Sequence, residues 1–378
     1  MGSYADDAQF MNRNDIEYIE LISDDGESKV MVVPAWQGRV MTTSAAGDAG
    51  DSYGWINYSF IKKKQINFQF NPVGGEERFW LGPEGGVFSL YFKQGEKQTY
   101  KNWRVPSVLD IEAFSVRSQS ENHVCLTKEG CLTNTYGTTF FLNIERTISL
   151  LDINEIVASF NIEIPEDLKV VAYKSENRIT NIGNESWSKK TGLISVWMLS
   201  MFNPTLTTTV FIPYKQSKKG KIVNDEYFGK IPTDRLIVEN GVIYFKIDGC
   251  FRSKLGIPAS CATNLCGSYD SSKEVLTVLW CDIFENSLNY MNGQWGRQKN
   301  PYCGDVINAY NDGPTEDGSM MGPFYEIETS SPGAELAPYE SLIHTQKIIH
   351  LQGNDKQVDY IIKKLFKTDI CAIKAKFQ

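Results

Sequence analysis

The segment TFFLNIERTISLL at residues 139–151 decides the fold class, because its apolar and polar side chains alternate along the chain. Successive side chains of a β-strand point to opposite faces of a sheet, so this alternation predicts a strand with one buried face. Residues 236–245 predict a hairpin: LIVE and VIYF are joined by Asn240-Gly241, and Asn-Gly accepts the positive φ angles of a type I′ turn. Both segments therefore predict antiparallel β-structure.

Segments of the same kind recur between residues 28 and 352, with clear examples at residues 87–92, 274–284 and 325–329. Helical spacing of apolar residues is convincing only near the C-terminus, where a helix at about 355–368 is expected to cover a sheet. No fixed-period repeat or low-complexity linker divides the chain. We therefore predict an all-β protein with one domain, residues 1–378, built as a large antiparallel β-sandwich with a C-terminal helix.

The composition limits the chemistry that the chain can carry out. It has 38 Lys and Arg against 46 Asp and Glu, a net charge of −8, with acids and bases interspersed. A general electrostatic attraction to phosphate backbones is thus not expected, nor is nucleic acid as a partner. The chain has only 3 His, although His is the commonest acid or base near neutral pH. If the protein is an enzyme, carboxylates are expected to transfer the protons.

We expect neither a cofactor nor a metal ion. The sequence has no GxxxxGK[ST] motif, and no GxGxxG lies between a strand and a helix, so nucleotide binding has no support. The 8 cysteines lack CxxC and Cys/His spacing and are expected to be buried free thiols, although their even number leaves disulfides open. A Gly-x-Ser-x-Gly elbow is absent, which disfavours a serine hydrolase.

Residues 191–214 form the longest uncharged stretch, but Asn203-Pro204 interrupts it. Two strands joined at this turn are expected there, and no membrane span. The first residues lack the basic and apolar regions of a secretory signal, so the chain is either cytosolic or already trimmed. We favour the periplasm or cell envelope, with a signal removed, over the cytoplasm.

Residues 74–86, GGEERFWLGPEGG, combine residue types that suit a sugar site. Glycines let a ligand approach the backbone, an indole packs on the C–H face of a sugar ring, and charged groups hold its hydroxyls. The alternative is a turn-rich connection whose Glu and Arg side chains pair with each other. The candidate binding residues of this segment are Glu76, Glu77, Arg78, Trp80 and Glu84.

Glu326 and Glu328 lie two positions apart in a predicted strand, so both project from the same face, with Cα atoms about 6.5–7 Å apart. If this face is buried, the two acids disfavour each other's ionisation, and one pKa rises toward the range useful for proton transfer. If it is exposed, they are ordinary surface acids. The nearby segment 304–314 contributes Asp305 and Asn308, and we expect a polar loop at the mouth of a site there in preference to a Ca²⁺ site.

A third polar segment, residues 177–184, is expected to form a turn between strands, and its Asn181 is a further candidate for sugar binding. The histidines are interpreted as structural, because His344 and His350 lie on one alternating strand and His123 lies in another segment.

Taken together, these segments resemble the galactose mutarotase (aldose 1-epimerase) superfamily over most of the chain. The resemblance is specific for an uncharacterised bacterial branch, whose members carry segments like PAWQGRVM at 34–41, GWIN at 54–57 and the glycine-rich ERFW stretch. For the characterised enzymes it rests on residues 177–181 and on 328–332 followed by Leu336, Pro338 and Glu340. The resemblance implies a β-supersandwich with a sugar site on a concave sheet face.

The resemblance also implies a chemistry. In mutarotases a Glu takes the proton from the anomeric hydroxyl while a His protonates the ring oxygen, so the ring opens, rotates and closes again. The base carries over to Glu328, with Glu326 as the second choice. The acid does not carry over, because Ile182 follows Thr180-Asn181 where the mutarotases have His. Glu76, Glu77, Glu84 or Asp305 could replace it, or the protein does not epimerise sugars.

Two hypotheses follow for the function. The first is a carbohydrate-active enzyme, either a mutarotase-like isomerase or a hydrolase or lyase that uses two carboxylates. The second is a non-catalytic carbohydrate-binding protein that has lost the epimerase acid and uses Trp80, Trp103 and Trp295 as stacking platforms. Both imply a mono- or oligosaccharide partner, and the sequence specifies neither the sugar nor the oligomeric state.

Overall fold

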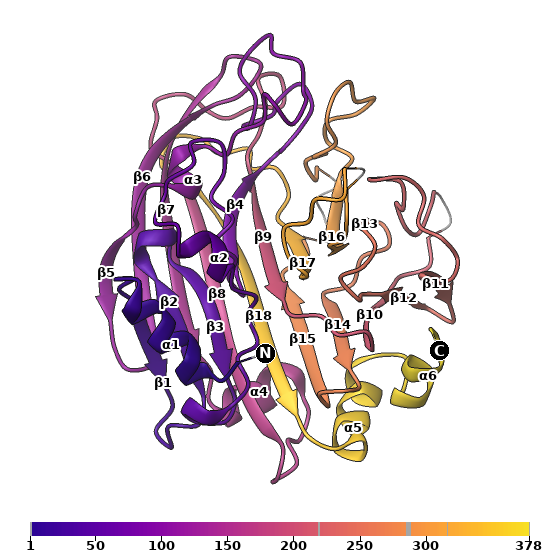
Figure 1. Cartoon of the computed structure of the whole chain (residues 1–378). Helices are drawn as coiled ribbons and strands as arrows, with labels where there is room; N and C mark the ends of the chain where they lie inside the picture. Colours follow the sequence, from indigo (N-terminus) through magenta and orange to yellow (C-terminus); the bar gives the residue numbers. More distant parts are fainter. Residues whose placement is uncertain (1, 218–219, 285–288, 316, 378) are drawn as a thin grey trace.

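Two antiparallel sheets form the centre of the protein (Figure 1). The computed structural model describes residues 2–217, 220–284, 289–315 and 317–377. The larger sheet has ten strands in the order β11-β12-β10-β14-β15-β18-β8-β7-β6-β5. In chain order these are β5 (Ser115–Gln119), β6 (His123–Thr133), β7 (Thr139–Leu150), β8 (Lys169–Asn181), β10 (Thr208–Pro213), β11 (Leu236–Glu239), β12 (Val242–Lys246), β14 (Leu265–Asp270), β15 (Val275–Cys281) and β18 (Ser341–Gln352).

The second sheet has five strands in the order β13-β16-β17-β9-β4, and these strands run side by side in Figure 1. They are β4 (Arg78–Gly82), β9 (Ser195–Phe202), β13 (Ser253–Pro258), β16 (Asp305–Asn311) and β17 (Tyr325–Ser330). A smaller sheet of β1 (Ile19–Ile22), β2 (Lys29–Val33) and β3 (Arg39–Ser44) adjoins β4 through a bridge between Val40 and Glu77. The all-β prediction is confirmed.

The main hydrophobic core lies between the ten-stranded and five-stranded sheets. Leu142, Ile144 and Ile148 of β7 are fully buried in the same cluster as Ile307 of β16 and Ile327 of β17. The alternation that predicted the strand at 139–151 therefore has the expected cause, since one set of its side chains fills this core. The predicted hairpin is also present: β11 and β12 pair in register, and Asn240 and Gly241 have φ angles of 50° and 82°.

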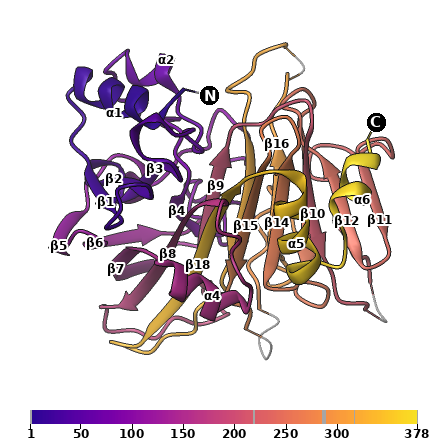
Figure 2. The same cartoon turned by 90° about the horizontal axis from the view of Figure 1, so that it is seen from below.

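Helices cover the outer side of the ten-stranded sheet at its β10–β12 end, as Figure 2 shows for α5 and α6. The predicted C-terminal helix is α5 (Asp355–Leu365), whose Val358, Ile361 and Ile362 pack against Phe211, Tyr244 and other sheet residues together with α6 (Ile370–Ala375). The helix α4 (Ile153–Phe160) contributes Ile156 to the same cluster. The C-terminal helix therefore acts as the cover that its apolar stripe predicted.

The sequence interpretation missed other helices. The helix α1 (Tyr4–Arg13) begins at a capping box between Ser3 and Asp6, and α4 begins at one between Asp152 and Glu155. Both boxes are visible in the sequence. The single-turn helices α2 (Tyr58–Ile61) and α3 (Ser107–Asp110) are too short to leave a periodic pattern.

The strand predicted at residues 87–92 is wrong. These residues form turns in which Ser89 and Leu90 donate backbone hydrogen bonds to Gly86 and Pro83. The neighbours Tyr91 and Phe92 are both buried, so their side chains do not alternate between a core face and a solvent face. The apolar side chains of this segment belong to a loop and pack on other aromatic residues.

The uncharged stretch at 191–214 contains β9 and β10, as predicted, with the turn after Asn203-Pro204 between them. The two strands enter different sheets, so this turn carries the chain from the five-stranded sheet to the ten-stranded sheet. Among the described residues, no helix is long and apolar enough to cross a membrane.

Candidate functional site

The outer face of the five-stranded sheet, which points away from the ten-stranded sheet, carries the candidate catalytic acids. In β17, Thr329 faces inward and donates a hydrogen bond to Gln346 of β18 (2.8 Å), while Ile327 is buried in the core. The alternation of side chains then directs Glu326 and Glu328 to the outer face. The prediction that the two acids share one face is confirmed, and both acids are buried, since Glu326 is 7% and Glu328 1% exposed.

Glu328 is held by two donors from neighbouring strands. Lys254 Nζ of β13 lies 2.8 Å from its carboxylate, and Trp197 Nε1 of β9 donates to Oε2 at 2.9 Å. Lys254 also lies over the rings of Trp197 and Tyr227, each 5.4 Å from the ammonium group. Burial of the Lys254 ammonium lowers its pKa, but the charge and hydrogen bond of Glu328, together with the charges of Glu84 and Glu326, outweigh this effect, so the pKa of Lys254 is raised. The two groups form a buried ion pair at the centre of the outer face.

Glu326 has a different partner and a different charge balance. Arg78 of β4 donates to Glu326 Oε1 through Nη2 at 3.2 Å, and its guanidinium stacks on the Trp80 ring at 4.0 Å. Burial raises the pKa of Glu326 to about 7; Arg78 opposes this rise, and the charge of Glu328 adds to it. Glu326 is therefore able to carry a proton near neutral pH.

The five-stranded sheet brings three further predicted residues to the same place. Glu84 follows β4, and burial raises its pKa while the Lys254 ammonium opposes the rise. Burial also raises the pKa of Asp305, which accepts a hydrogen bond from Tyr227 (2.5 Å) and feels the charge of Lys254. Asn308 donates to the Tyr227 hydroxyl (3.3 Å). The loop expected at residues 304–314 is wrong for most of its length, because Asp305–Asn311 form the strand β16. Lys254 thus lies among the carboxylates of Glu84, Glu328 and Asp305.

An aromatic cluster lies beside these acids. Trp80 is 6.2 Å from Trp103 and 5.5 Å from Trp197, measured between ring centroids. Trp103 in turn lies 6.3 Å from Trp295, and both indoles lie beside Glu84. Trp80 and Trp103 are buried, whereas Trp295 is 38% exposed. Of the three predicted stacking platforms, Trp295 alone presents a large part of its ring to solvent.

Glu76, Glu77 and Asn181 lie elsewhere. Glu77 is fully buried between the sheets, where it pairs with Arg146 of β7 at 2.6 Å, and Glu76 lies 3.0 Å from His350 of β18. These two acids precede β4 and face the ten-stranded sheet, on the side opposite to Glu328. The segment 74–86 therefore divides its charged residues between two layers.

The side-chain amide of Asn181 forms hydrogen bonds with backbone groups. Its Nδ2 donates to the carbonyl oxygens of Glu185 (2.8 Å) and Leu336 (3.0 Å), and its Oδ1 accepts from the amide of Gly183. This residue ends β8 in the ten-stranded sheet and holds a turn there. The turn expected at residues 177–184 thus begins only after the strand ends.

The alternative interpretation of residues 74–86, in which their Glu and Arg residues pair with each other, does not describe the ion pairs seen. Arg78 pairs with Glu326, and Glu77 pairs with Arg146. Both partners are distant in the sequence. The charged residues of this segment therefore join separate strands of the two sheets.

Sequence reasoning missed Lys254, Trp197 and Tyr227. The signal for Trp197 was weak, because it lies in the fully buried run of β9 and looks like a core residue. Lys254 was the more visible case, since it is a charged residue within an otherwise mostly buried strand. A buried cation in a strand needs a buried acid nearby. The sequence therefore indicates that Lys254 has an acidic partner but does not identify it.

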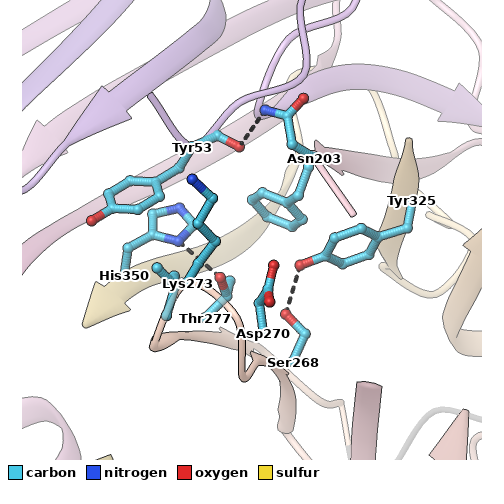
Figure 3. A pocket seen from close by; sticks show the side chains of 10 residues that line it. Tyr53, Asn203, Ser268, Asp270, Lys273, Thr277, Tyr325 and His350 are labelled. Carbon is cyan, nitrogen blue, oxygen red and sulfur yellow. Dashed lines mark hydrogen bonds between the residues drawn. The ribbon is translucent and has the colours of Figure 1, made fainter. Parts of the chain in front are cut away.

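The cavity of Figure 3 is separate from Glu326 and Glu328. It lies around Tyr53, Asp270 and His350, and its volume of about 20 Å³ is enough for roughly one water molecule. His350 bonds with Thr277 through Nδ1 (2.9 Å) and with Glu76 through Nε2 (3.0 Å), and His344 bonds with Thr329 (2.9 Å). Both histidines are thus part of the polar core, in agreement with the structural interpretation.

All eight cysteines are free thiols, but only Cys261, Cys266 and Cys281 are buried, so the expectation that the thiols are buried holds for part of the set. Within the described parts of the chain, no group of three or more His, Cys, Asp or Glu side chains is arranged to hold a metal ion.

Solved structures of other proteins have the same architecture. The Slr1438 protein from Synechocystis sp. PCC 6803 matches 89% of this chain and 96% of its own, with a TM-score of 0.54 and 13% identity. A galactose mutarotase-like protein from Lactobacillus casei ATCC 334 matches 88% of this chain and 100% of its own, with a TM-score of 0.54 and 11% identity. The fold is thus galactose mutarotase-like, as the resemblance noted from the sequence predicted.

Within this class, the chain belongs to a family of unknown function, DUF6786, whose family model matches residues 2–377. No curated protein sequence matches the chain.

Proposed function

We propose that the outer face of the five-stranded sheet binds a sugar and that Glu328 and Glu326 transfer protons at its anomeric centre. One observation carries the proposal: two buried carboxylates on neighbouring positions of one face have different partners, Lys254 for Glu328 and Arg78 for Glu326. Pairs of acids whose surroundings differ in this way are the usual arrangement for a base and an acid in one site. The mutarotase-like fold supports the choice of a sugar as the ligand.

In the proposed reaction, Glu328 takes the proton of the anomeric hydroxyl, and the bond between C1 and the ring oxygen breaks. The ring oxygen takes a proton from Glu326, whose pKa of about 7 leaves it protonated in part of the molecules at neutral pH. The open-chain aldehyde rotates about its C1–C2 bond and closes on the other face, which returns both protons. In this scheme Glu326 replaces the histidine that Ile182 cannot supply.

The surrounding groups have supporting roles in the proposal. Arg78 Nε and Trp80 Nε1 are buried donors without a hydrogen-bond partner among the described residues. Buried donors of this kind are costly unless something accepts from them, and sugar oxygens are suitable acceptors. Lys254 is the most exposed of the charged residues that hold the two acids, at 14% of its side chain, so we propose that the sugar enters on its side.

The test is exchange between the anomers of free sugars. Saturation transfer between the anomeric protons, measured by NMR with a panel of aldoses, should show faster exchange with the protein than without it. Glu328→Gln should abolish the acceleration and Glu326→Gln should reduce it, because each removes one proton-transfer group. Glu129→Gln, which changes an exposed glutamate of β6, is the matched control and should keep the full rate.

Three results would contradict the proposal. If Glu328→Gln keeps the acceleration while the variant is folded, as judged by its thermal melting curve, Glu328 is not the base. If aldoses bind without faster exchange, the protein is a carbohydrate-binding protein without epimerase activity, and if none binds, the sugar site itself is wrong.

A further inference from the structure

Two loops beside the carboxylates concentrate positive charge. Residues 93–104 and 294–299, which we call the rim, contain six basic side chains and one acidic one in a chain whose net charge is −8. The acid, Glu96, pairs with Arg104 at 3.0 Å. The charge of Lys93 also acts on Glu96. The four remaining basic residues of the rim are exposed and form no ion pair with any residue that the structure describes: Lys97, Lys101, Arg297 and Lys299.

The two loops form one surface. The amide of Gly296 donates to Gln98 Oε1 at 2.6 Å, and the same oxygen accepts from the amide of Gly86 at 2.9 Å. Trp295 also packs edge-on against Phe92, with ring centroids 5.1 Å apart. The rim is therefore attached to the segment that follows β4, close to Glu84.

Exposed aromatic rings lie among these charges. Tyr100 is 66% exposed and stacks on Trp103 at 6.0 Å with an interplanar angle of 17°. Trp295, 38% exposed, lies 6.3 Å from Trp103 at an angle of 25°. Trp103 itself lies 6.2 Å from Trp80, on which the guanidinium of Arg78 stacks. A continuous series of rings thus connects the surface of the rim with the candidate sugar site.

We infer that the rim binds an anionic oligosaccharide, whose rings carry uronate carboxylates or sulfate groups, as it extends out of the candidate sugar site. The inference rests on the proposed function and names its substrate class. Exposed aromatic rings pack on the apolar faces of sugars, and unpaired Lys and Arg side chains bind carboxylate or sulfate oxygens. A neutral oligosaccharide would form no ion pairs with the four unpaired cations, and a small free anion would not pack on the aromatic rings.

A single-stranded nucleic acid would use the same two residue types. The neighbouring acids favour the oligosaccharide, because Glu84, Glu326 and Glu328 lie at the inner end of the ring series and would repel a backbone phosphate that lay beside them. In an oligosaccharide the anionic groups are separated by neutral, hydroxyl-bearing ring atoms that can face these acids.

The experiment is calorimetric titration of the whole chain with oligogalacturonates of increasing length and with neutral cello-oligosaccharides of the same lengths, at low and high salt. We expect the affinity for oligogalacturonates to rise with length and to fall with salt. The double variant Lys97→Ala/Lys101→Ala should lower this affinity roughly tenfold at low salt, since two exposed ion pairs are removed. Tyr100→Ala should weaken binding of the longer chains as well.

Matched controls are Lys356→Ala, at an exposed lysine of α5, and Tyr339→Ala, at a tyrosine that is 76% exposed. Neither should change the titrations, and the rim variants should leave anomeric exchange of monosaccharides unchanged. The inference is overturned if neutral chains bind as tightly as charged ones, if length has no effect, if the rim variants bind normally, or if a single-stranded oligonucleotide binds more tightly. Binding through the rim without accelerated exchange of any aldose refutes only the proposed chemistry.

Discussion

Replacing Lys254 by methionine removes the cation of the buried pair and leaves its acid in place. Glu328 is 1% exposed and Lys254 14%, so the substitution leaves an almost fully buried carboxylate with Trp197 as its remaining donor. Breaking a buried ion pair in this way typically costs about 3–5 kcal/mol. Because Lys254 retains some contact with solvent and Trp197 still donates a hydrogen bond, we expect the free energy of unfolding to fall by about 3 kcal/mol at pH 7.

The pH sets an upper limit to this loss. An unpaired buried carboxylate can avoid the penalty by taking up a proton, which for an ordinary glutamate costs about 3.7 kcal/mol at pH 7 and about 1 kcal/mol at pH 5. The difference between the wild type and Lys254→Met should therefore shrink to about 1 kcal/mol at pH 5. Urea unfolding followed by tryptophan fluorescence at the two pH values measures it.

A double-mutant cycle identifies the pair as the cause. Lys254→Met combined with Glu328→Gln should lose much less stability than the sum of the single variants, because the double variant leaves no unpaired charge. Lys128→Met is the control: its partner Glu112 lies at 2.6 Å, but the two side chains are 25% and 40% exposed, so its loss should stay below about 1 kcal/mol. If Lys254→Met costs no more than this control, or if its cost is the same at pH 5, the buried pair does not exist in solution.

Three further outcomes are expected. The pKa of Glu326 is raised from 4.5 to about 7 in the folded state. The stability that this shift contributes is fully present below pH 4.5 and is lost as the pH rises through 7, a decline in the unfolding free energy of up to about 3 kcal/mol between pH 4.5 and 8. Glu326→Gln should remove this decline, because it removes the titrating group. Arg146→Met should lose about 3–5 kcal/mol in urea unfolding, because it leaves the fully buried Glu77 unpaired; a loss below about 1 kcal/mol would contradict this. Gly241→Ala should lower the melting temperature through a loss of about 1 kcal/mol, because its φ of 82° strains any side chain, and an unchanged melting curve would show that the turn rearranges.

Elements defined by local pattern could be predicted from the sequence. The strand β7 and the β11–β12 hairpin depend on alternation and on the Asn240-Gly241 turn, all within a few residues. The shared face of Glu326 and Glu328 follows from the same period of two. The strand expected at residues 87–92 failed for the complementary reason, since apolar residues there pack on tryptophans from distant segments and need no partner strand.

The site divides in the same way between local and distant causes. Glu77 and Arg78 are neighbours in the chain, yet one pairs with Arg146 in the ten-stranded sheet and the other with Glu326 in the five-stranded sheet. Successive residues of an extended chain point to opposite faces, so the direction of each was foreseeable, but the layer that each face meets was not. Residues 74–86 therefore serve two layers, although their closeness in the sequence suggested a single site.

The sequence by itself determined the β-class of the protein, the hairpin, the C-terminal helix and the common face of Glu326 and Glu328, because each of these depends on periodicity or turn chemistry along a short segment. Only the tertiary structure decided which charges meet. Lys254 and Trp197 lie 74 and 131 positions from Glu328, and the strand order β13-β16-β17-β9 brings them to its carboxylate. That order is set by how two twisted sheets bury their apolar faces against each other, which is a property of the whole chain and of no single segment.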